Sequence, residues 1–520
     1  MRSDTKWWTL AVACAATFML LVDLTIVVVA LPPIQRALHS SFSDVEWVVD
    51  AYALSLAAGL LTAGSLADRF GQRRVFAVGL VVFTLGSAVC GVAQSPAMLI
   101  VSRAAQGVGG AVLFATSLSL IANAFRGRDR GIAFGVWGAI TGFAAGLGPI
   151  LGGVITTDLT WRGIFLVNVP IGVVTIGITV WKVGEFRAEQ APSPDWAGFV
   201  LFTGAMVSLV YGLTEAGITS WGNGAVVASL ALSAVVLLAF VLVERRVAHP
   251  MLDLSLFRIP TFDGGLVAAF AMNASLFAMV LYLVLYLQDD LGYSALAAGT
   301  RLLLVTGVTM VVATAAGRVS SHVPVRLLIA PGLLLVGVGL LLMAGIGADT
   351  SWTHLIPGFV LAGAGSGLVN PPLASTAVGV VRPARAGMAS GANSTGRQIG
   401  VALGVAAYGT IFTAALSRQL RSSLAAVPAL AARRGTIVAA VQQGTIGSLI
   451  ERTGAGVRGS LVVAIRTAFA GALNDLLVVS GLVALAGAVG SVLLVRSRDF
   501  VVPSGGTDAA RLGDEKLLVP

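Results

Sequence analysis

The sequence contains little charge. Aspartate, glutamate, lysine and arginine make up 11% of its 520 residues, against about 25% in soluble domains. Hydrophobic residues reach 57% before the 63 glycines are counted. A soluble enzyme of this size needs far more charged surface, so this composition excludes that class, and it also excludes disordered, collagen-like and coiled-coil chains. The composition is that of a polytopic membrane protein.

Residues that carry redox, nucleotide or metal chemistry are also scarce. The two cysteines, Cys14 and Cys90, lie inside apolar runs as small core residues, which excludes a disulfide framework. The three lysines are Lys6, Lys182 and Lys516, and none ends the glycine-rich pattern of a phosphate-binding loop. Bound ATP is therefore excluded as the energy source. The four histidines have no ligand spacing, so we expect no metal and no other cofactor.

Fourteen runs are apolar and long enough to cross a bilayer, which takes about 20 residues. They cover residues 8–31, 46–67, 75–95, 97–124, 132–155, 163–181, 196–216, 224–243, 262–287, 296–316, 326–347, 353–378, 387–415 and 471–495. Short loops on the side of the N-terminus hold most of the arginines, whereas those on the other side hold only Arg36 and Arg162. Because cytoplasmic loops are the positive ones, both termini are predicted to be cytoplasmic. The net charge of +9 then marks a membrane face and not a nucleic-acid surface.

The expected fold is all-α, with two pseudo-symmetric six-helix bundles and two inserted helices. A faint repeat favours it, because GSLADRFGQRR from Gly64 and GRVSSHVPVR from Gly317 share their offsets, and repeats of this kind are common in transporters. The predicted divisions are an N-terminal bundle (1–182), two linker helices with flanking loops (183–260), a C-terminal bundle (261–500) with a long extracellular loop (416–470), and a cytoplasmic tail (501–520). Within that loop, residues 457–473 are predicted to form an amphipathic helix on the outer surface.

Six motifs, in order, resemble those of the major facilitator superfamily. GSLADRFGQRR, RAAQGVGGAV and GLGPILGG are similar to its loop, fourth-span and fifth-span antiporter motifs. LVDLTIVVVALPPI, WRGIFLVNVPIG and GMASGANSTGRQIGVALG resemble the fourteen-span drug:proton antiporter branch. Two positions depart from the pattern, since Val28 stands where asparagine is usual and Ala144 where glycine is usual. These departures weaken an inference about the substrate more than one about the family.

The resemblance implies two conformational devices. The first is a latch in the charged loop, formed by Gly64, Asp68, Arg69, Gly71, Arg73 and Arg74. The alternative is that this loop only sets the orientation of the chain in the membrane, a role that needs the arginines but not the aspartate. The second is the antiporter motif of Gly148, Pro149, Gly152 and Gly153, where proline removes a helical hydrogen bond and the glycines permit close packing. The family associates this motif with export.

Three ionisable residues lie inside predicted spans. A charge at mid-bilayer costs at least ~2.5–3.5 kcal/mol, so such residues are functional by default. At 1.5 Å per residue, Asp23 lies about 12 Å, Arg103 about 9 Å and Asp50 about 6 Å from the outer end of its span. These depths allow an Asp23–Arg103 ion pair. We predict that the three residues couple transport to protons; the alternatives are a structural ion pair and, for Asp50, an interfacial position.

Further polar and aromatic residues are candidates to line a substrate cavity, with ordinary packing as the alternative for each. They are Trp137, Asn273, Phe277, Tyr282, Asn370, Asn393 and Arg397.

Motifs and charges together imply a drug:proton antiporter of the bacterial inner membrane. It is expected to export amphipathic, cationic or aromatic drugs or antibiotics, with the proton gradient as energy source, as a monomer surrounded by lipid and without a nucleic-acid partner. The alternative is a dedicated exporter of one endogenous antibiotic or metabolite. An importer is disfavoured by the Gly148–Pro149 motif, and a membrane enzyme or sensor by the lack of a catalytic constellation or soluble domain.

Overall fold

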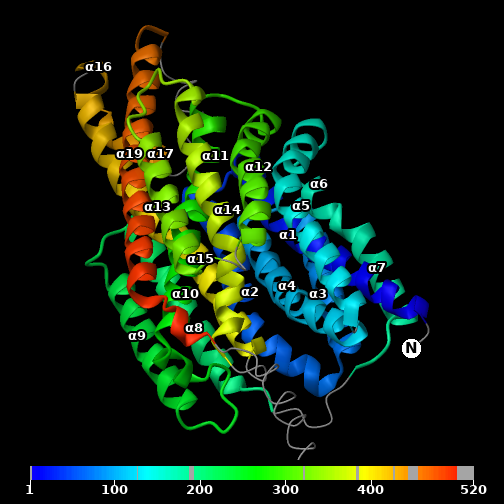
Figure 1. Ribbon diagram of the computed structural model, residues 1–520. Coiled ribbons are helices and arrows are strands. Elements are labelled where there is room, and N and C mark those ends of the chain that lie inside the picture. The colour runs from blue at the N-terminus through cyan, green and yellow to red at the C-terminus, as the bar shows by residue number, and fades with distance from the viewer. Residues whose placement is uncertain are drawn as a thin grey trace, which may run out of the picture.

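A computed structural model describes residues 3–125, 127–186, 193–319, 323–381, 386–425, 428–431, 433–442 and 455–500. Within these ranges the regular elements are helices, and they lie side by side in one bundle (Figure 1).

The first group of helices, blue to cyan in Figure 1, packs around α4. It contains α1 (Ser3–Leu38), α2 (Phe42–Phe70), α3 (Gln72–Gly91), α4 (Pro96–Ala124), α5 (Gly127–Asp158), α6 (Gly163–Leu166) and α7 (Asn168–Lys182). Helices α1, α2 and α3 contact α4, while α5 lies along α1 and α7 along α3. We call this the first half.

The second half packs around α14, α15 and α19. It contains α10 (Pro260–Met272), η2 (Asn273–Phe277), α11 (Ala278–Leu285), η3 (Tyr286–Asp290), α12 (Ala295–Val319), α13 (Arg326–Met343), η4 (Trp352–Leu355), α14 (Ile356–Gly379), α15 (Ala386–Ala425), α16 (Pro428–Ala431), α17 (Arg434–Gln442), α19 (Ala455–Leu494) and η6 (Ser497–Asp499). Helix α14 contacts α12 and α13, and α19 contacts α10, α13 and α15.

Two helices stand between the halves in the chain. Helices α8 (Trp196–Ile218) and α9 (Gly224–Glu244) pack on each other, and the short η1 (Leu254–Arg258) leads on to α10. Because α8 also contacts both α2 and α15, this pair lies beside the contact between the two halves.

The two halves meet through α2 with α15 and through α5 with α12. Among the described residues, four hydrogen bonds that involve a side chain cross this contact, with donor–acceptor distances of 2.7–3.3 Å. Written from donor to acceptor, they are Gln288 to Val29, Tyr282 to Glu46, Leu296 to Thr157, and Thr395 to Ala57. Three of them lie toward the end of the bundle that holds the α1–α2 connection. We call it the distal end; it is uppermost in Figure 1, and the N-terminus lies at the opposite, proximal end.

Local sequence explains where α2 begins and ends. A capping box starts the helix, because Ser41 Oγ accepts from the backbone N–H of Asp44 (3.1 Å) while the Asp44 carboxylate accepts from the backbone N–H of Ser41 (2.9 Å). Gly71 ends it with φ of 101°, a left-handed conformation that favours glycine. The charged loop motif therefore covers the end of α2, the turn at Gly71 and the start of α3.

The glycines of the antiporter motif form a packing face of α5. A Cβ added at Gly148 would collide with Thr25 of α1, and one at Gly152 would lie 2.8 Å from the Ile26 carbonyl oxygen. One added at Gly153 would lie 2.5 Å from Leu296 Cα of α12. Since helices approach this closely only where side chains are absent, these glycines hold α5 against both halves. Pro149 lies inside α5, which continues through it to Asp158.

Twelve helical stretches of the described chain are long and apolar enough to cross a membrane. Helices α2 (29 residues) and α5 (32 residues) are not among the twelve, although the predicted spans 46–67 and 132–155 lie on them. The number fourteen therefore stays a prediction.

The prediction of a separate surface helix over residues 457–473 is wrong. Helix α19 runs without a break from Ala455 to Leu494, about 60 Å at 1.5 Å per residue, and packs on α13 and α15. No proline interrupts it, and the apolar residues of its first half join the same core as the span. Helix α15 likewise continues ten residues past the predicted end of its span, to Ala425. Residues 443–454 and 501–520 of the predicted loop and tail lie outside the described ranges.

The glycine face predicts how one substitution affects stability. Gly152→Val should lower the free energy of unfolding by about 1–3 kcal/mol, because overpacking a tight contact forces neighbours to shift. The measurement is the melting temperature of purified protein in detergent. Gly177→Val is the matched control, since a Cβ at Gly177 meets no atom within 4 Å. Equal melting temperatures for the two variants would contradict the assigned contact.

Candidate functional site

An ion pair between Asp23 and Arg103 lies at the centre of the first half. Arg103 Nη1 of α4 is 2.5 Å from Asp23 Oδ2 of α1. The exposed fractions are 0% for Asp23 and 2% for Arg103, so both charges are withdrawn from solvent. The similar depths read from the sequence are thus matched by direct contact between the two side chains.

Amides and a hydroxyl from three helices complete the network. Gln106 Nε2 and Asn168 Nδ2 both donate to Asp23 Oδ1, at 2.8 and 3.2 Å. Gln106 Oε1 accepts from Arg103 at 2.8 Å, and Ser87 Oγ accepts from both amides while donating to the carbonyl of Phe165. Each carboxylate oxygen of Asp23 therefore has a partner, as a buried charge requires.

The Arg103 guanidinium is held on its remaining sides by α2 and an aromatic ring. Its Nε donates to the carbonyl oxygen of Val48 at 3.3 Å. Its Cζ lies 4.0 Å from the ring centroid of Tyr52 and 5.8 Å from that of Phe165. A cation over an aromatic face is stabilised by the ring quadrupole, and this stabilisation is larger when the cation is desolvated. The ion pair thus ties α2 to α1 and α4.

This geometry makes the network sensitive to a proton. A proton on Asp23 would cancel its charge and leave Arg103 as an unpaired cation in the interior, and breaking a buried pair costs about 3–5 kcal/mol. Protonation therefore disfavours this arrangement relative to one in which Arg103 finds other partners. A ligand that binds two states unequally shifts the equilibrium between them, and a proton on Asp23 would be such a ligand.

Asp50 is not part of this network. It is 0% exposed, and neither of its carboxylate oxygens has a hydrogen-bond partner among the described residues. One helical turn away, Glu46 is 2% exposed, and its Oε1 lies 3.1 Å from Tyr282 Oη. Asp50 is therefore withdrawn from solvent in this structure, and the alternative of an interfacial position stays a prediction. The two acids form a separate site, which we call the α2 acid pair.

The charged loop is docked on the segment that follows α7. Arg73 and Arg74 lie 3.7 and 3.6 Å from the carboxylate of Glu185, whose Oε1 also accepts from the Arg73 backbone N–H (3.0 Å). Arg73 donates in addition to the carbonyl of Val183. Arg69 is exposed, and no neighbour lies within 4 Å of a Cβ added at Gly64. The side chain of Asp68 is outside the described part of the chain, so its predicted pairing is untested.

The predicted cavity residues occupy different places. Arg397 Nη1 donates to Asn370 Oδ1 at 2.9 Å, which gives Arg397 an amide partner on α14. Tyr282 belongs to the contact with α2, and Trp137 Nε1 donates to Thr17 within the first half. Asn273 and Asn393 are buried, whereas Phe277 is 41% exposed. The structure thus pairs two of the seven residues, Arg397 and Asn370, and places Trp137 in the other half.

The second half contains two π-helical turns that the sequence analysis did not predict. They begin at Asn273 and Tyr286 and interrupt the predicted span 262–287. Turns of this kind are frequent at functional sites, and the segment between them carries Tyr282 to the α2 acid pair.

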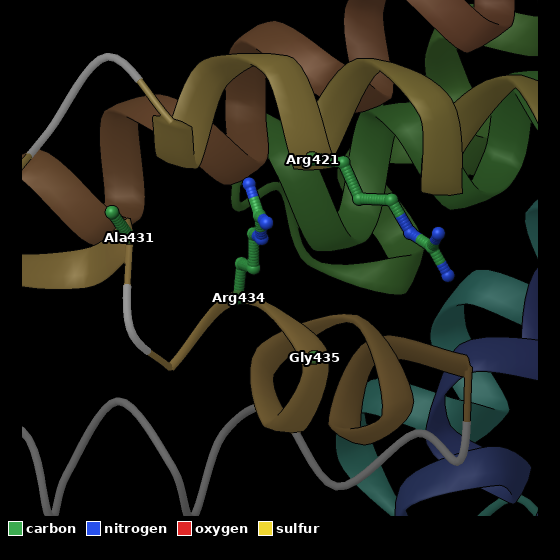
Figure 2. A pocket seen from close by; sticks show the side chains of 4 residues that line it. All are labelled: Arg421, Ala431, Arg434 and Gly435. Atoms are coloured by element: carbon green, nitrogen blue, oxygen red, sulfur yellow. The ribbon is translucent and has the colours of Figure 1, made fainter.

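One cavity lies outside this region, at the distal end. Its volume is about 700 Å³, and Figure 2 shows Arg421, Ala431, Arg434 and Gly435 around it. These residues belong to α15, α16 and α17, and both arginines are exposed. The cavity is remote from Asp23 in the chain and in the fold, so we do not include it in the site.

Several participants were missed from the sequence. Gln106 stands one helical turn after Arg103, and this spacing of a cation and an amide was the available signal. Glu46 and Asp50 are spaced for one face of a helix, but Glu46 is the first residue of its predicted span and was not considered. For Ser87, Asn168 and Glu185 we see no local signal, because their partners come from distant segments.

Comparisons with known proteins identify relatives. The profile described as Major Facilitator Superfamily matches residues 13–405. A puromycin resistance protein of Streptomyces alboniger is 36% identical over 446 residues, 85% of this chain and 86% of its own. The multidrug resistance protein Stp of Mycobacterium tuberculosis is 34% identical, covering 81% and 78%. A cephamycin export protein of Amycolatopsis lactamdurans is 36% identical, covering 79% and 86%.

A solved structure shows the same fold. A bacterial homologue of the human lysosomal transporter Spinster, in an inward-facing and occupied conformation, superposes with a TM-score of 0.68. The match covers 97% of this chain and 100% of that chain at 14% sequence identity.

The ion pair predicts a pattern of stability in three variants. Asp23→Asn and Arg103→Gln should each lower the free energy of unfolding by about 3–5 kcal/mol, because each leaves one buried charge unpaired. The double variant removes both charges, so its free energy of unfolding should fall by no more than half as much as that of either single variant. Melting temperatures in detergent measure the effect. A double variant that loses as much as the two single losses added together would contradict a direct pair.

Proposed function

Because the chain belongs to the major facilitator superfamily, a family of membrane transporters, we propose that it exports amphipathic, drug-like compounds in exchange for protons. It is a multi-pass protein of the bacterial cytoplasmic membrane, and its relatives include proteins named for resistance to drugs and antibiotics. The observation that carries the proposal is the buried, fully partnered Asp23 carboxylate, whose arrangement a single proton would destabilise.

The proposed topology has fourteen spans with both termini in the cytoplasm. Helices α2 and α5 are the two spans beyond the twelve, since each is long enough to cross the hydrocarbon core and each packs between other spans. The loops at the proximal end carry most of the arginines, which supports a cytoplasmic position for that end. The distal end then faces the outside.

In this topology the described conformation is closed toward the outside. The hydrogen bonds between the halves lie at the distal end and near mid-helix, and the α5 glycines pack against α12 at the same end. The ion pair is buried inside the first half. In the proposed cycle a proton from the outside reaches Asp23 only in the state that is open there.

The proposed cycle alternates between two access states. With the outside open, a proton binds Asp23 and releases Arg103 from its partner, and the protonated protein then closes outside and opens inside. Loss of the proton to the cytoplasm restores the ion pair, and substrate bound from the cytoplasm drives the return. Arg73 and Arg74 on Glu185 would stabilise one of these states as a latch. The chain acts alone as a monomer and needs no cofactor.

The proposed substrates are cationic or aromatic amphipathic compounds. The second candidate function is the dedicated export of one endogenous antibiotic, which the relatives named for puromycin resistance and cephamycin export favour. Transport of a panel separates the two: ethidium, tetraphenylphosphonium, puromycin and a cephalosporin would all be exported by a multidrug transporter, and at most one by a dedicated exporter.

Coupling can be tested with the neutral double variant Asp23→Asn/Arg103→Gln, which leaves no unpaired charge. In everted membrane vesicles with an imposed proton gradient, substrate-dependent proton movement should be at least about tenfold slower in the variant than in the parent, because the proton acceptor is gone. Protein amount and melting temperature are measured on the same preparations.

The matched control is Asp475→Asn, which neutralises an exposed carboxylate paired with Arg418 and should leave proton movement unchanged. Proton movement by the folded double variant at the level of the parent would refute Asp23 as the coupling residue.

A further inference from the structure

The α2 acid pair has no counter-charge. Glu46 and Asp50 are almost completely buried, and among the described residues no lysine, arginine or histidine forms an ion pair with either. The helices that pack on α2, together with α11, carry charged or titratable groups that include Asp23 and Arg36 (α1), Cys90 (α3), Arg103 (α4), Glu215 (α8), Tyr282 (α11), and Arg397 and Tyr408 (α15). Among these cations, Arg36 donates to the carbonyl oxygen of Pro32, Arg103 is bonded to Asp23, and Arg397 is bonded to Asn370.

The hydroxyl of Tyr282 lies near two acceptor oxygens but has one hydrogen to donate. Tyr282 Oη lies 2.8 Å from the carbonyl oxygen of Val405 and 3.1 Å from Glu46 Oε1. A phenol has one hydrogen, so it can donate fully to only one of these acceptors. If the closer carbonyl takes it, the contact with Glu46 is favourable only when the carboxyl donates a hydrogen of its own.

Asp50 points to the same requirement. Its negative charge would be repelled by that of Glu46, and neither of its oxygens accepts a hydrogen bond within the described part of the chain. A buried carboxylate without a partner costs several kcal/mol, and a second one beside it adds repulsion. The closed packing is therefore compatible with a pair that carries at least one proton and not with two free carboxylates.

The surrounding rings exclude a larger cation. Phe42, Tyr282, Tyr286, Tyr408, Phe412 and Phe469 form a continuous cluster with ring centroids 5.0–6.5 Å apart, the spacing of rings in direct contact. A Cβ added at Gly409 of α15 would collide with the Glu46 carboxylate. The cation that fits between these groups is a proton.

We propose that Glu46 and Asp50 form a second proton-binding site, located where the two halves meet, and that its proton holds the distal end closed. Loss of the proton places two like charges in the contact between α2 and α15 and separates the halves there. The inference rests on the proposed function, because external protons reach the pair only if the distal end faces the outside. External acidity then favours the state closed to the outside, by a group distinct from Asp23.

The test measures opening of the distal end directly, without transport. Spin labels are attached at Gln94→Cys and Ser351→Cys, exposed positions on the two halves, and pulsed electron resonance gives their distance between pH 5 and pH 9. The labelled parent should move from a short to a longer distance as the pH rises. Glu46→Gln/Asp50→Asn, which is neutral at every pH, should keep the short distance throughout. The chain without introduced cysteines is the labelling blank, since Cys14 and Cys90 are buried.

Glu215→Gln is the matched control, because it removes an acid on neighbouring α8 and should leave the pH response of the parent unchanged. If the double variant does not fold, Glu46→Gln and Asp50→Asn alone decide, and each should reduce the response. A pH response in the neutral variants equal to that of the parent, or no response in the parent, would overturn the proposal. Asp23→Asn/Arg103→Gln carrying the labels separates the two sites: a retained response with lost proton movement supports the second site, whereas a lost response assigns it to Asp23.

Discussion

The first half depends on the need to pair a charge that has left water. Asp23 and Arg103 are buried in a region built for lipid, and each is stable there only while the other is charged and close. The pair recruits Gln106, Asn168 and Ser87, so that α1, α3, α4 and α7 are held through one carboxylate. Under the proposed function, one proton on Asp23 would remove the interaction that organises the rest.

Helix α2 connects the two acidic sites. Its Val48 carbonyl accepts from Arg103, and its Tyr52 ring lies under the same guanidinium. Glu46 contacts Tyr282 and Gly409 of the second half, and Asp50, one helical turn later, lies on the same face of α2. A rearrangement of Arg103 therefore acts on the helix that carries the α2 acid pair. The glycines of α5 pack on α1 at Thr25 and Ile26, within one helical turn of Asp23 in the chain.

The sequence predicted those features that depend on distance along one helix. The depths of Asp23 and Arg103 follow from counting residues, and the family follows from motifs such as GSLADRFGQRR, which the profile match confirms. Features that depend on the direction of a side chain, or on a partner far away in the chain, did not follow. Glu46 at a predicted membrane boundary gave no reason to expect burial by Tyr282 and Gly409. The surface helix at 457–473 was wrong because amphipathic character does not distinguish a helix on a membrane from the start of a longer one.

The central claim is that a proton gradient alone drives transport. The direct measurement uses purified protein in liposomes without nucleotide, with ethidium as substrate and a pH difference imposed across the bilayer. The account predicts that ethidium moves against its concentration gradient while the pH difference lasts and stops when a protonophore removes it. Uphill transport that continues after the pH difference has collapsed would contradict the account.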